Sequence, residues 1–471
     1  MTITKRNRVG EVRDHTASIR RLTWSMMDKW LRCKRMWYYR YVGQVDTPPS
    51  MPLLFGTLMH DLFQQEMTLN RMYQQAGEAV WNTEIARRQN APDAYVEMRL
   101  KDIETVVDTW LDAALVPFQS TEERRLSDAV KGVVSYTEEE ARQHAGLATE
   151  MFKVWLRLHG SSDLERYRVL AVEPQFVNVQ LVKPDLRPHR GWRQGGRVDA
   201  VLEDIQTGSV FIREYKTTSL SDAREMEKRV ALDPQVRLYA DILSRVLSDL
   251  LQGRPIEQVQ YAVLRKQLPR VPNLVNCKRC RGSGSITKKS FKEEETSVLS
   301  QSETEVWSDA KPTDRFTCPV CRGRQRVPST DKRIDTTEDT LRSFLLENNH
   351  RLGPFQDLLP NLHPWERYVN LSTHWLTDDD RTEARTESSR VAKEITRSVR
   401  RYQTDNGETP HLELLGECFP RNTSWCSGPG GWCSYREVCQ TRQRAEDLKD
   451  RLGWVHAPDS PELVNPDTEG S

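Results

Sequence analysis

The stretch "SVFIREYKTTS", residues Ser209–Ser219, has the composition of a β-strand. Its first half is apolar, yet its second half carries Glu214 and Lys216, which point to the same side because side chains alternate along a strand. A second run shortly before it, "GGRVDAVLED", is also expected to form a strand and contains Asp199. Burying an unpaired charge is costly. We therefore expect the cluster either to be fully paired or to bind a ligand.

Two carboxylates at one end of neighbouring strands repel each other, and a divalent cation is the natural way to keep both ionised. Hard oxygen ligands favour Mg²⁺ or Mn²⁺. A lysine beside them would orient or activate a metal-bound water and neutralise charge on a phosphate. Asp199, Glu214 and Lys216 are thus a candidate site for phosphodiester hydrolysis. The alternative is an ordinary cross-strand ion pair on a solvated face.

The composition of the chain sets limits on its class. It has 471 residues, of which 37% are hydrophobic and 29% charged, with a formal net charge of +1. These values suit a globular protein of two or three structural units. The chain shows no bilayer-length apolar run and no secretory signal, so we expect a cytoplasmic protein, in the host cytoplasm if it is phage-encoded. It also lacks a "GxxxxGK[ST]" phosphate loop, so a motor function is not expected.

Hydrophobic periodicity predicts an α/β fold, with a mixed sheet flanked by helices. "LTWSMMDKWLRCKRMWYYRYV" is expected to form one helix capped by Thr23 or Ser25. Strands are expected from Tyr167 onward, followed by a helix that begins near Pro234. The predicted segments are a basic arm (1–22), a helical part (23–166), the α/β core (167–269), a metal-binding insertion (270–335), a second helical part (336–455) and a disordered tail (456–471).

Asp199 followed, after a strand-length gap, by Glu214-x-Lys216 resembles the core of the PD-(D/E)XK nucleases. Two further motifs resemble the RecB-like branch of that superfamily: "GTLMH" matches its GxxxH helix, and "QVRLY" matches its Gln-x-x-x-Tyr helix. The resemblance implies a restriction-endonuclease-like core. It also implies catalytic roles for Asp199, Glu214 and Lys216, Mg²⁺ or Mn²⁺ ligation by His60, Asp199 and Glu214, and supporting roles for Glu173, Gln235 and Tyr239. Individually, His60 suits a core position, and Gln235 and Tyr239 suit packing and capping.

This resemblance implies a metal-dependent DNA nuclease, in particular an exonuclease acting on single-stranded DNA or DNA ends. Its setting would be recombination, repair or phage DNA processing, with a helicase or other recombination protein as a possible partner and no membrane association. The alternative is a catalytically silent nucleic-acid-binding or adaptor protein of a recombination complex. The polarity of digestion, the preference for DNA over RNA and the oligomeric state do not follow from the sequence.

Clustered spacing of the nine cysteines indicates metal sites, since a reducing compartment disfavours disulfides. One set forms two Cys-x2-Cys knuckles, which predict a tetrahedral Zn²⁺ site and resemble the DnaJ cysteine-rich repeat locally. The zinc either closes a polar insertion or builds a DNA-contacting zinc ribbon, and both interpretations remain open. The four predicted zinc ligands are Cys277, Cys280, Cys318 and Cys321.

The second set lies in "SWCSGPGGWCSYREVC", which holds Cys426, Cys433 and Cys439. Together with Cys33 these residues resemble the iron–sulfur arrangement of the AddB nuclease and the CRISPR-associated RecB-like exonucleases. That resemblance implies a structural [4Fe–4S] cluster on four thiolates. The spacing departs from the family pattern, so Cys418 remains an alternative to Cys426. Zinc in the same thiolates, or unligated core cysteines, would be the plainer interpretations.

Overall fold

The structure is a computed structural model that divides into two compact units, residues 1–266 with 369–471, and residues 267–368. It describes residues 21–43, 45–46, 50–115, 136–230, 233–292, 295–296, 299–322, 324–328, 335–348, 350, 352–405, 408–426, 433, 435–436, 439 and 455–456. The predicted basic arm, apart from its last two residues, and the predicted disordered tail, apart from its first residue, lie outside the described residues.

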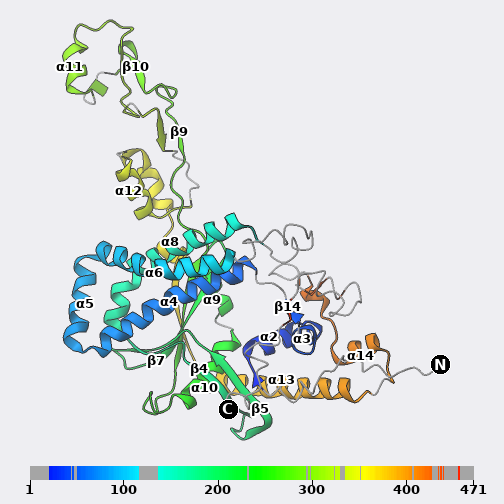
Figure 1. Cartoon of the computed structure of the whole chain (residues 1–471). Coiled ribbons are helices and arrows are strands. Elements are labelled where there is room, and N and C mark those ends of the chain that lie inside the picture. Colours follow the sequence, from blue (N-terminus) through cyan, green and yellow to red (C-terminus); the bar gives the residue numbers. More distant parts are fainter. Residues whose placement is uncertain are drawn as a thin grey trace. The chain divides into compact units, whose positions relative to one another are not determined.

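A five-stranded mixed sheet forms the centre of the first unit (Figure 1). β7 pairs in parallel with β8, and every other pairing in this sheet is antiparallel. The predicted α/β class is therefore confirmed. The strand order is β13 (Val369–Trp375), β8 (Gln258–Arg265), β7 (Val210–Thr218), β6 (Ala200–Asp204) and β3 (Tyr167–Val172).

Each face of this sheet is covered by helices. On one face Leu202 and Phe211 pack with Met67 of α4 (Met51–Gln75). On the other face Val201 and Ile212 belong to the main core, which also contains residues of α10 (Pro234–Val246) and α13 (Asp378–Thr404). The alternation of side chains thus gives the strands two buried faces, as a layered α/β fold requires.

Helices pack around this sheet in two groups. In the first group, α4, α6 and α8 contact one another, and α5 contacts all three (Figure 1). In the second group α13 contacts α2, α10 and α14. The bounds not yet given are α2 (Trp24–Arg32), α3 (Lys34–Tyr41), α5 (Glu78–Asn90), α6 (Pro92–Leu115), α8 (Glu138–Arg166), α9 (Arg224–Val230) and α14 (His411–Cys418).

A second, three-stranded sheet has the order β1 (Arg21–Leu22), β5 (Pro188–Arg197) and β4 (Gln175–Val182). β4 and β5 form an antiparallel hairpin, and β1 runs parallel to β5. A short pair, β2 (Val45–Asp46) with β14 (Val455–His456), joins segments from near the two ends of the chain. β5 leads directly to Asp199, so this hairpin fixes one approach to the candidate site.

Three local predictions differ from the structure. The expected first helix is interrupted at Cys33, whose backbone is extended (φ −160°) and separates α2 from α3. "GGRVDAVLED" is not one strand, because β5 ends at Arg197 and β6 begins at Ala200. Strand β13 lies inside a stretch that was predicted to be helical. These features depend on pairing with distant strands and helices, which local periodicity does not encode.

The second unit is built from short elements. Two small antiparallel pairs, β10 with β11 and β12 with β9, place its four cysteines close together. Among the described residues of both units, no helix is long and apolar enough to cross a bilayer. The elements are β9 (Leu274–Asn276), β10 (Ser285–Thr287), η3 (Lys288–Ser290), α11 (Gln301–Trp307), β11 (Arg315–Thr317), β12 (Arg326–Pro328), α12 (Glu338–Glu347), η5 (Gly353–Asn361) and η6 (Trp365–Arg367).

Candidate active site

Asp199 occupies the point where β5 and β6 break apart. Its Oδ2 accepts the backbone N–H of Tyr215 at 2.7 Å, just beyond the last ladder pair between β6 and β7. Its Oδ1 lies 2.9 Å from Nδ1 of His60, which α4 supplies from 139 residues earlier in the chain. The break between strands therefore leaves the carboxylate free to bridge β7 and α4.

His60 is about one-third exposed, with 32% of its side chain accessible to solvent. Burial acts to lower the pKa of its imidazole, but the hydrogen bond to Asp199 and the charges of Asp199 and Glu214 outweigh burial and raise that pKa. The geometry thus joins the "GTLMH" histidine to the strand carboxylates, although the two lie far apart in sequence. A cation bound between them would compete with the proton of His60 for the same electron pairs.

Glu214 is 4% exposed, and its surroundings disfavour the charged form of its carboxyl. Burial raises the pKa of its carboxyl to about 7, and the neighbouring charge of Asp199 adds to the effect, against the opposing influence of Lys216. A buried carboxyl beside a second carboxylate holds a proton unless a cation neutralises it. The donor set and its charge therefore suit a divalent cation.

Lys216 lies on the same face of β7 as Glu214, and its Nζ is 2.8 Å from Glu214 Oε1. Burial acts to lower the pKa of this lysine, but the carboxylates of Glu214, Asp233 and Asp199 outweigh it and raise the pKa. Lys216 is therefore protonated in the neutral range. Its ammonium can hold an anion or an oxygen lone pair but cannot accept a proton in this state.

Of the supporting residues, Glu173 lies closest to these carboxylates. Its backbone N–H donates to the carbonyl of Asp199 at 2.8 Å, and its φ of +43° places it in the left-handed region. Its carboxylate pairs with Arg197 at 3.2 Å. Burial raises the pKa of Glu173; Arg197 opposes that shift, while Asp199 and Asp61 add to it. Glu173 thus belongs to the same electrostatic group as Asp199.

Tyr239 is buried at 5% exposure and acts in packing. Its ring packs edge-to-face on Phe176, and its hydroxyl accepts the backbone N–H of Trp24 at 3.4 Å. A Cβ added to Gly196 would stand 2.6 Å from this ring, so the close approach of β5 to α10 requires a glycine there. Gln235 is half-buried in the first turn of α10, where its backbone N–H is capped by Asp233.

Two carboxylates near the site were not singled out from the sequence. Asp61 follows His60, and burial raises its pKa against the influence of His60 and Arg197. Asp233 caps α10 and is among the carboxylates that raise the pKa of Lys216. The N-cap pattern Asp-Pro was the one local signal for Asp233, and it indicates a helix start but no proximity to Lys216.

The two cysteine sets differ in their geometry. Cys277, Cys280, Cys318 and Cys321 are buried, and their sulfur atoms all lie within 4.8 Å of one another. Among the described residues, no other group of three or more histidine, cysteine or acidic side chains brings its ligand atoms so close. The ligand atoms of His60, Asp199 and Glu214 are thus farther apart than those of the four cysteines. The first set is therefore arranged to bind a single metal ion.

In the knuckles of this first set, the backbone takes the left-handed region directly after each second cysteine. Arg281 has φ +52° and Arg322 has φ +50°, and Gly282 follows at +82°. The backbone N–H of Gly284 points at the sulfur of Cys280 at 3.3 Å. Burial acts to raise the pKa of Cys280, but this hydrogen bond and the neighbouring thiols outweigh it and lower the pKa to about 7. A thiol this acidic is ready to ligate metal.

The second set is looser, but it is gathered in one place. The backbone N–H of Asn422 points at Cys33 Sγ at 3.4 Å, and the N–H of Cys433 donates to the carbonyl of Cys426 at 3.2 Å. Burial raises the pKa of Cys433, and the charges of Cys33 and Cys426 add to it, so the three thiols lie near one another.

The remaining two cysteines have different surroundings. Burial raises the pKa of Cys439; Tyr39 and Arg35 oppose the shift, while Cys33 adds to it. Cys418 ends α14 inside the main hydrophobic core, and its charged neighbours are Arg401, Glu417 and Asp405. Cys439 therefore lies with the Cys33 group, whereas within the described residues the groups that act on the pKa of Cys418 are Arg401, Glu417 and Asp405.

A family model described as the PD-(D/E)XK nuclease superfamily matches residues 21–440. A search of curated proteins finds no match. The matched range contains the whole central sheet and its breaks, and it also contains every described residue of the candidate site.

Proposed function

This chain belongs to the PD-(D/E)XK nuclease superfamily, and on that premise we propose that it is a metal-dependent deoxyribonuclease whose active site is the Asp199–Glu214–Lys216 cluster with His60. The observation that carries the proposal is the pairing of His60 with Asp199 beside a buried Glu214. The site contains more carboxylate than its one lysine neutralises. Such an arrangement favours a divalent cation over a closed structural ion pair.

Asp199, Glu214 and His60 would hold Mg²⁺ or Mn²⁺, which when bound supplies a Lewis acid and an acidified water. The backbone N–H of Tyr215 holds Oδ2 of Asp199, so the orientation of this carboxylate would already be fixed before a metal binds. Lys216 is a permanent cation beside Glu214 and would orient the attacking water and neutralise charge on the phosphate.

Glu173 and Tyr239 would support the site in different ways. Glu173 adds negative charge next to Asp199 and ties β3 to the end of β5 through its N–H. Tyr239 fixes α10 against β5. Gln235, one turn before Tyr239, is the less buried of the two and is the better placed to contact the nucleic-acid strand.

We propose single-stranded DNA or DNA ends as the substrate and exonucleolytic cleavage as the activity, in recombination, repair or phage DNA processing. The absence of a phosphate-loop motif from the sequence favours ends and single strands, because this chain carries no recognisable motor to unwind long duplex. A helicase partner would extend this range, and a cytoplasmic location would fit such a role.

We propose Cys33, Cys426, Cys433 and Cys439 as ligands of a [4Fe–4S] cluster, and Cys277, Cys280, Cys318 and Cys321 as ligands of Zn²⁺. The cysteines around Cys33 are more widely spaced, which suits a cluster of several irons. The sulfur atoms of the Cys277 set lie within 4.8 Å of one another, which suits one ion. The placement of Cys418 in the core supports Cys426 as the third C-terminal ligand. Elemental analysis of anaerobic protein tests both, since Cys33→Ser should remove iron alone and Cys277→Ser zinc alone.

The proposed function is tested by mixing anaerobically purified full-length protein with end-labelled single-stranded DNA and Mn²⁺. Asp199→Ala and Lys216→Ala are run alongside, and Lys101→Ala, which changes an exposed residue of α6, serves as a control outside the site. Cleavage by the unaltered protein and the control, lost in both site variants, is the expected result. Binding of DNA without cleavage by any form would instead favour the alternative, a catalytically silent nucleic-acid-binding or adaptor protein.

A further inference from the structure

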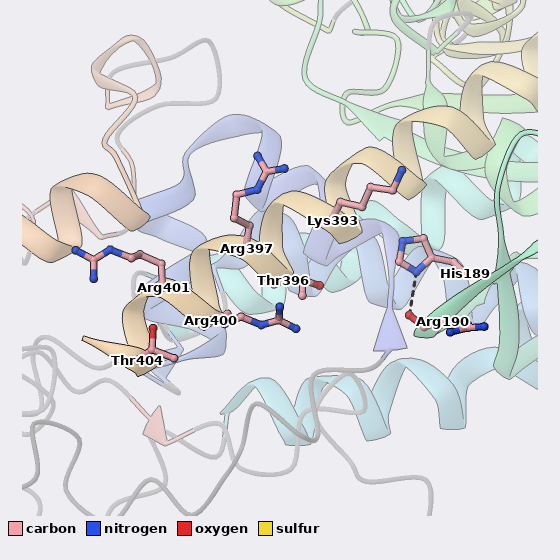
Figure 2. A pocket seen from close by; sticks show the side chains of 8 residues that line it. All are labelled: His189, Arg190, Lys393, Thr396, Arg397, Arg400, Arg401 and Thr404. Atoms are coloured by element: carbon pink, nitrogen blue, oxygen red, sulfur yellow. Dashed lines mark hydrogen bonds between the residues drawn. The ribbon is translucent and has the colours of Figure 1, made fainter. Parts of the chain in front are cut away.

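A cavity of about 480 Å³ lies between the C-terminal half of α13 and the start of β5 (Figure 2), and none of the candidate active-site residues lines it. Figure 2 shows the basic side chains of α13 spaced along one stretch of that helix, with Arg190 and His189 approaching from β5. The lining residues are His189, Arg190, Lys393, Thr396, Arg397, Arg400, Arg401 and Thr404.

The charge of this cavity is one-sided. Its lining includes four arginines, a lysine and a histidine but no carboxylate. Arg401 pairs with Asp405 and Glu417. Within the described part of the chain, Arg190, Lys393, Arg397 and Arg400 have no carboxylate within ion-pair distance. Like charges crowded without counter-charge repel one another, so an anion would stabilise this arrangement.

The sequence of α13 shows where this imbalance begins. Acidic residues recur along the helix up to Glu394, and none follows before its end at Thr404. Cations in the last turn of a helix are favoured by its dipole, and that accounts for Arg401. It does not account for Lys393, which lies three turns from the end, or for Arg190, which belongs to a different element. The cavity therefore gathers cations beyond what helix stability explains.

The walls of the cavity are held in place by hydrogen bonds. Thr396 accepts from the indole N–H of Trp192 at 2.9 Å and donates to the carbonyl of Ala392 at 2.8 Å, which fixes α13 to β5. His189 is 9% exposed, and its Nδ1 lies 3.2 Å from the carbonyl of Arg190. The exposed cations thus project from a rigid base, which reduces the entropy lost when they bind a ligand.

Strand β5 connects this cavity to the candidate active site. Arg190 stands near its start and Arg197 at its end, two residues before Asp199. Asp199 stands nine positions after Arg190, so the two lie no more than about 30 Å apart at the rise of an extended strand. A nucleic-acid strand with one phosphate per about 3.4 Å would cover that distance in about nine nucleotides, or in fewer when it is stretched.

We propose that the cavity between α13 and β5 is a phosphate-binding site for the backbone of the nucleic-acid strand whose end lies in the cleavage site. This inference rests on the proposed nuclease function and deepens it, because it names the contacts that hold the strand away from the scissile bond. Arginine and lysine side chains contact backbone phosphates irrespective of base sequence, so the site favours length over sequence.

The test measures binding of fluorescein-labelled single-stranded DNA to full-length protein without divalent metal, using a 6-mer and a 30-mer of mixed sequence. The variant Arg397→Ala/Arg400→Ala removes two charges from α13, and Arg190→Ala probes the site from β5. The matched control, Lys101→Ala/Arg142→Ala, removes two exposed charges from α6 and α8 outside the cavity.

The double variant should bind the 30-mer about tenfold more weakly, with a salt dependence shallower by about 1.4 because two phosphate contacts are lost. The affinity of the control for both lengths should stay within about twofold, and the 6-mer should bind the unaltered protein more weakly than the 30-mer because it makes fewer phosphate contacts. No loss in any cavity variant, or an equal loss in the control, would overturn the proposal. Binding of inorganic phosphate that the cavity variants weaken, with no change in their affinity for the 30-mer, would likewise overturn the proposal in favour of a small-anion site.

Failure of the proposed function would look different. In that case the unaltered protein would not cleave DNA, or Asp199→Ala would leave cleavage and its metal dependence unchanged, whereas these binding measurements use no cleavage at all.

Discussion

Strand β7 carries charged side chains on both faces, and the two faces differ in how completely those charges are paired. On one face Arg213 is fully buried, forms two hydrogen bonds to Asp163 at 2.5 and 3.1 Å, and donates to Gln260 at 2.8 Å. On the other face Glu214 and Lys216 pair with each other, while Asp199 adds a second carboxylate.

The pKa values follow this difference. Burial acts to lower the pKa of Arg213, but Asp163 and its other neighbours outweigh burial and raise it, so the guanidinium is charged and satisfied. The pKa of Glu214 instead rises to about 7, which shows an unfavourable environment for its charge. A buried charge that finds all its partners in the protein is structural, whereas one that lacks them indicates a ligand from outside.

The largest expected effect comes from neutralising Glu214, on the face of β7 where the charges are incompletely paired, which we call the incomplete face. Glu214→Gln keeps the shape of the side chain but removes the charge that would hold a cation, so single-turnover cleavage should fall by at least about 10³-fold. The melting temperature, followed by calorimetry, should change little, because burial and Asp199 already disfavour the charge of Glu214 in the native state. A large loss of stability without metal would show that Glu214 is a structural residue like Arg213.

Removing the fully paired charge of Arg213, on what we call the complete face of β7, should lower the stability of the fold. Arg213→Met leaves Asp163 buried without a partner and should lower the free energy of unfolding by about 3–5 kcal/mol, measured by urea denaturation. The double variant Arg213→Met/Asp163→Leu should recover much of that loss, since it buries no charge. Cleavage by the fraction that stays folded should be nearly normal, and a specific catalytic loss would contradict a purely structural role.

The raised pKa of Glu214 also predicts a pH dependence of metal binding. Its folded pKa of about 7 lies above its ordinary value of 4.5, so the metal-free native state holds this proton up to neutral pH. The stabilising effect of that proton is complete below pH 4.5 and is lost as the pH rises through 7. Because metal displaces this proton and also the proton of His60, Mn²⁺ affinity measured by calorimetry should rise by more than about tenfold per pH unit below neutral pH and level off at higher pH. A flat profile would place the metal elsewhere.

The smallest effect is expected at the rim of the site. Arg197 pairs with Glu173 at 3.2 Å but is 54% exposed on its side chain. Arg197→Ala should therefore cost less than about 1 kcal/mol in urea denaturation and change cleavage only a few-fold. A loss as large as that of Glu214→Gln would move Arg197 into the catalytic machinery.

The incomplete face could be predicted from the sequence because its signal is local. Glu214 and Lys216 are two residues apart on one strand, and alternation alone puts them together. The pairing of His60 with Asp199 spans 139 residues and was implied by the family resemblance. The complete face could not be predicted, since nothing in the sequence links Arg213 to Asp163 on α8 before the helix is packed on the sheet.

The same distinction applies to the fold. The mixed sheet and the start of α10 follow from periodicity and from the Asp-Pro cap. The break before Ala200, the interruption at Cys33 and the edge strand β13 result from long-range pairing. The break before Ala200 matters most for function, because it frees Asp199 to accept the Tyr215 N–H and face His60.

The most direct test of the account is the amount of Mn²⁺ bound per chain, measured by electron paramagnetic resonance on zinc-loaded, full-length protein. The unaltered protein and Arg213→Met/Asp163→Leu should bind Mn²⁺ alike, and Asp199→Asn/Glu214→Gln should lose that binding together with cleavage. Retention of tight Mn²⁺ binding by Asp199→Asn/Glu214→Gln would contradict the assignment of the metal to the incomplete face of β7.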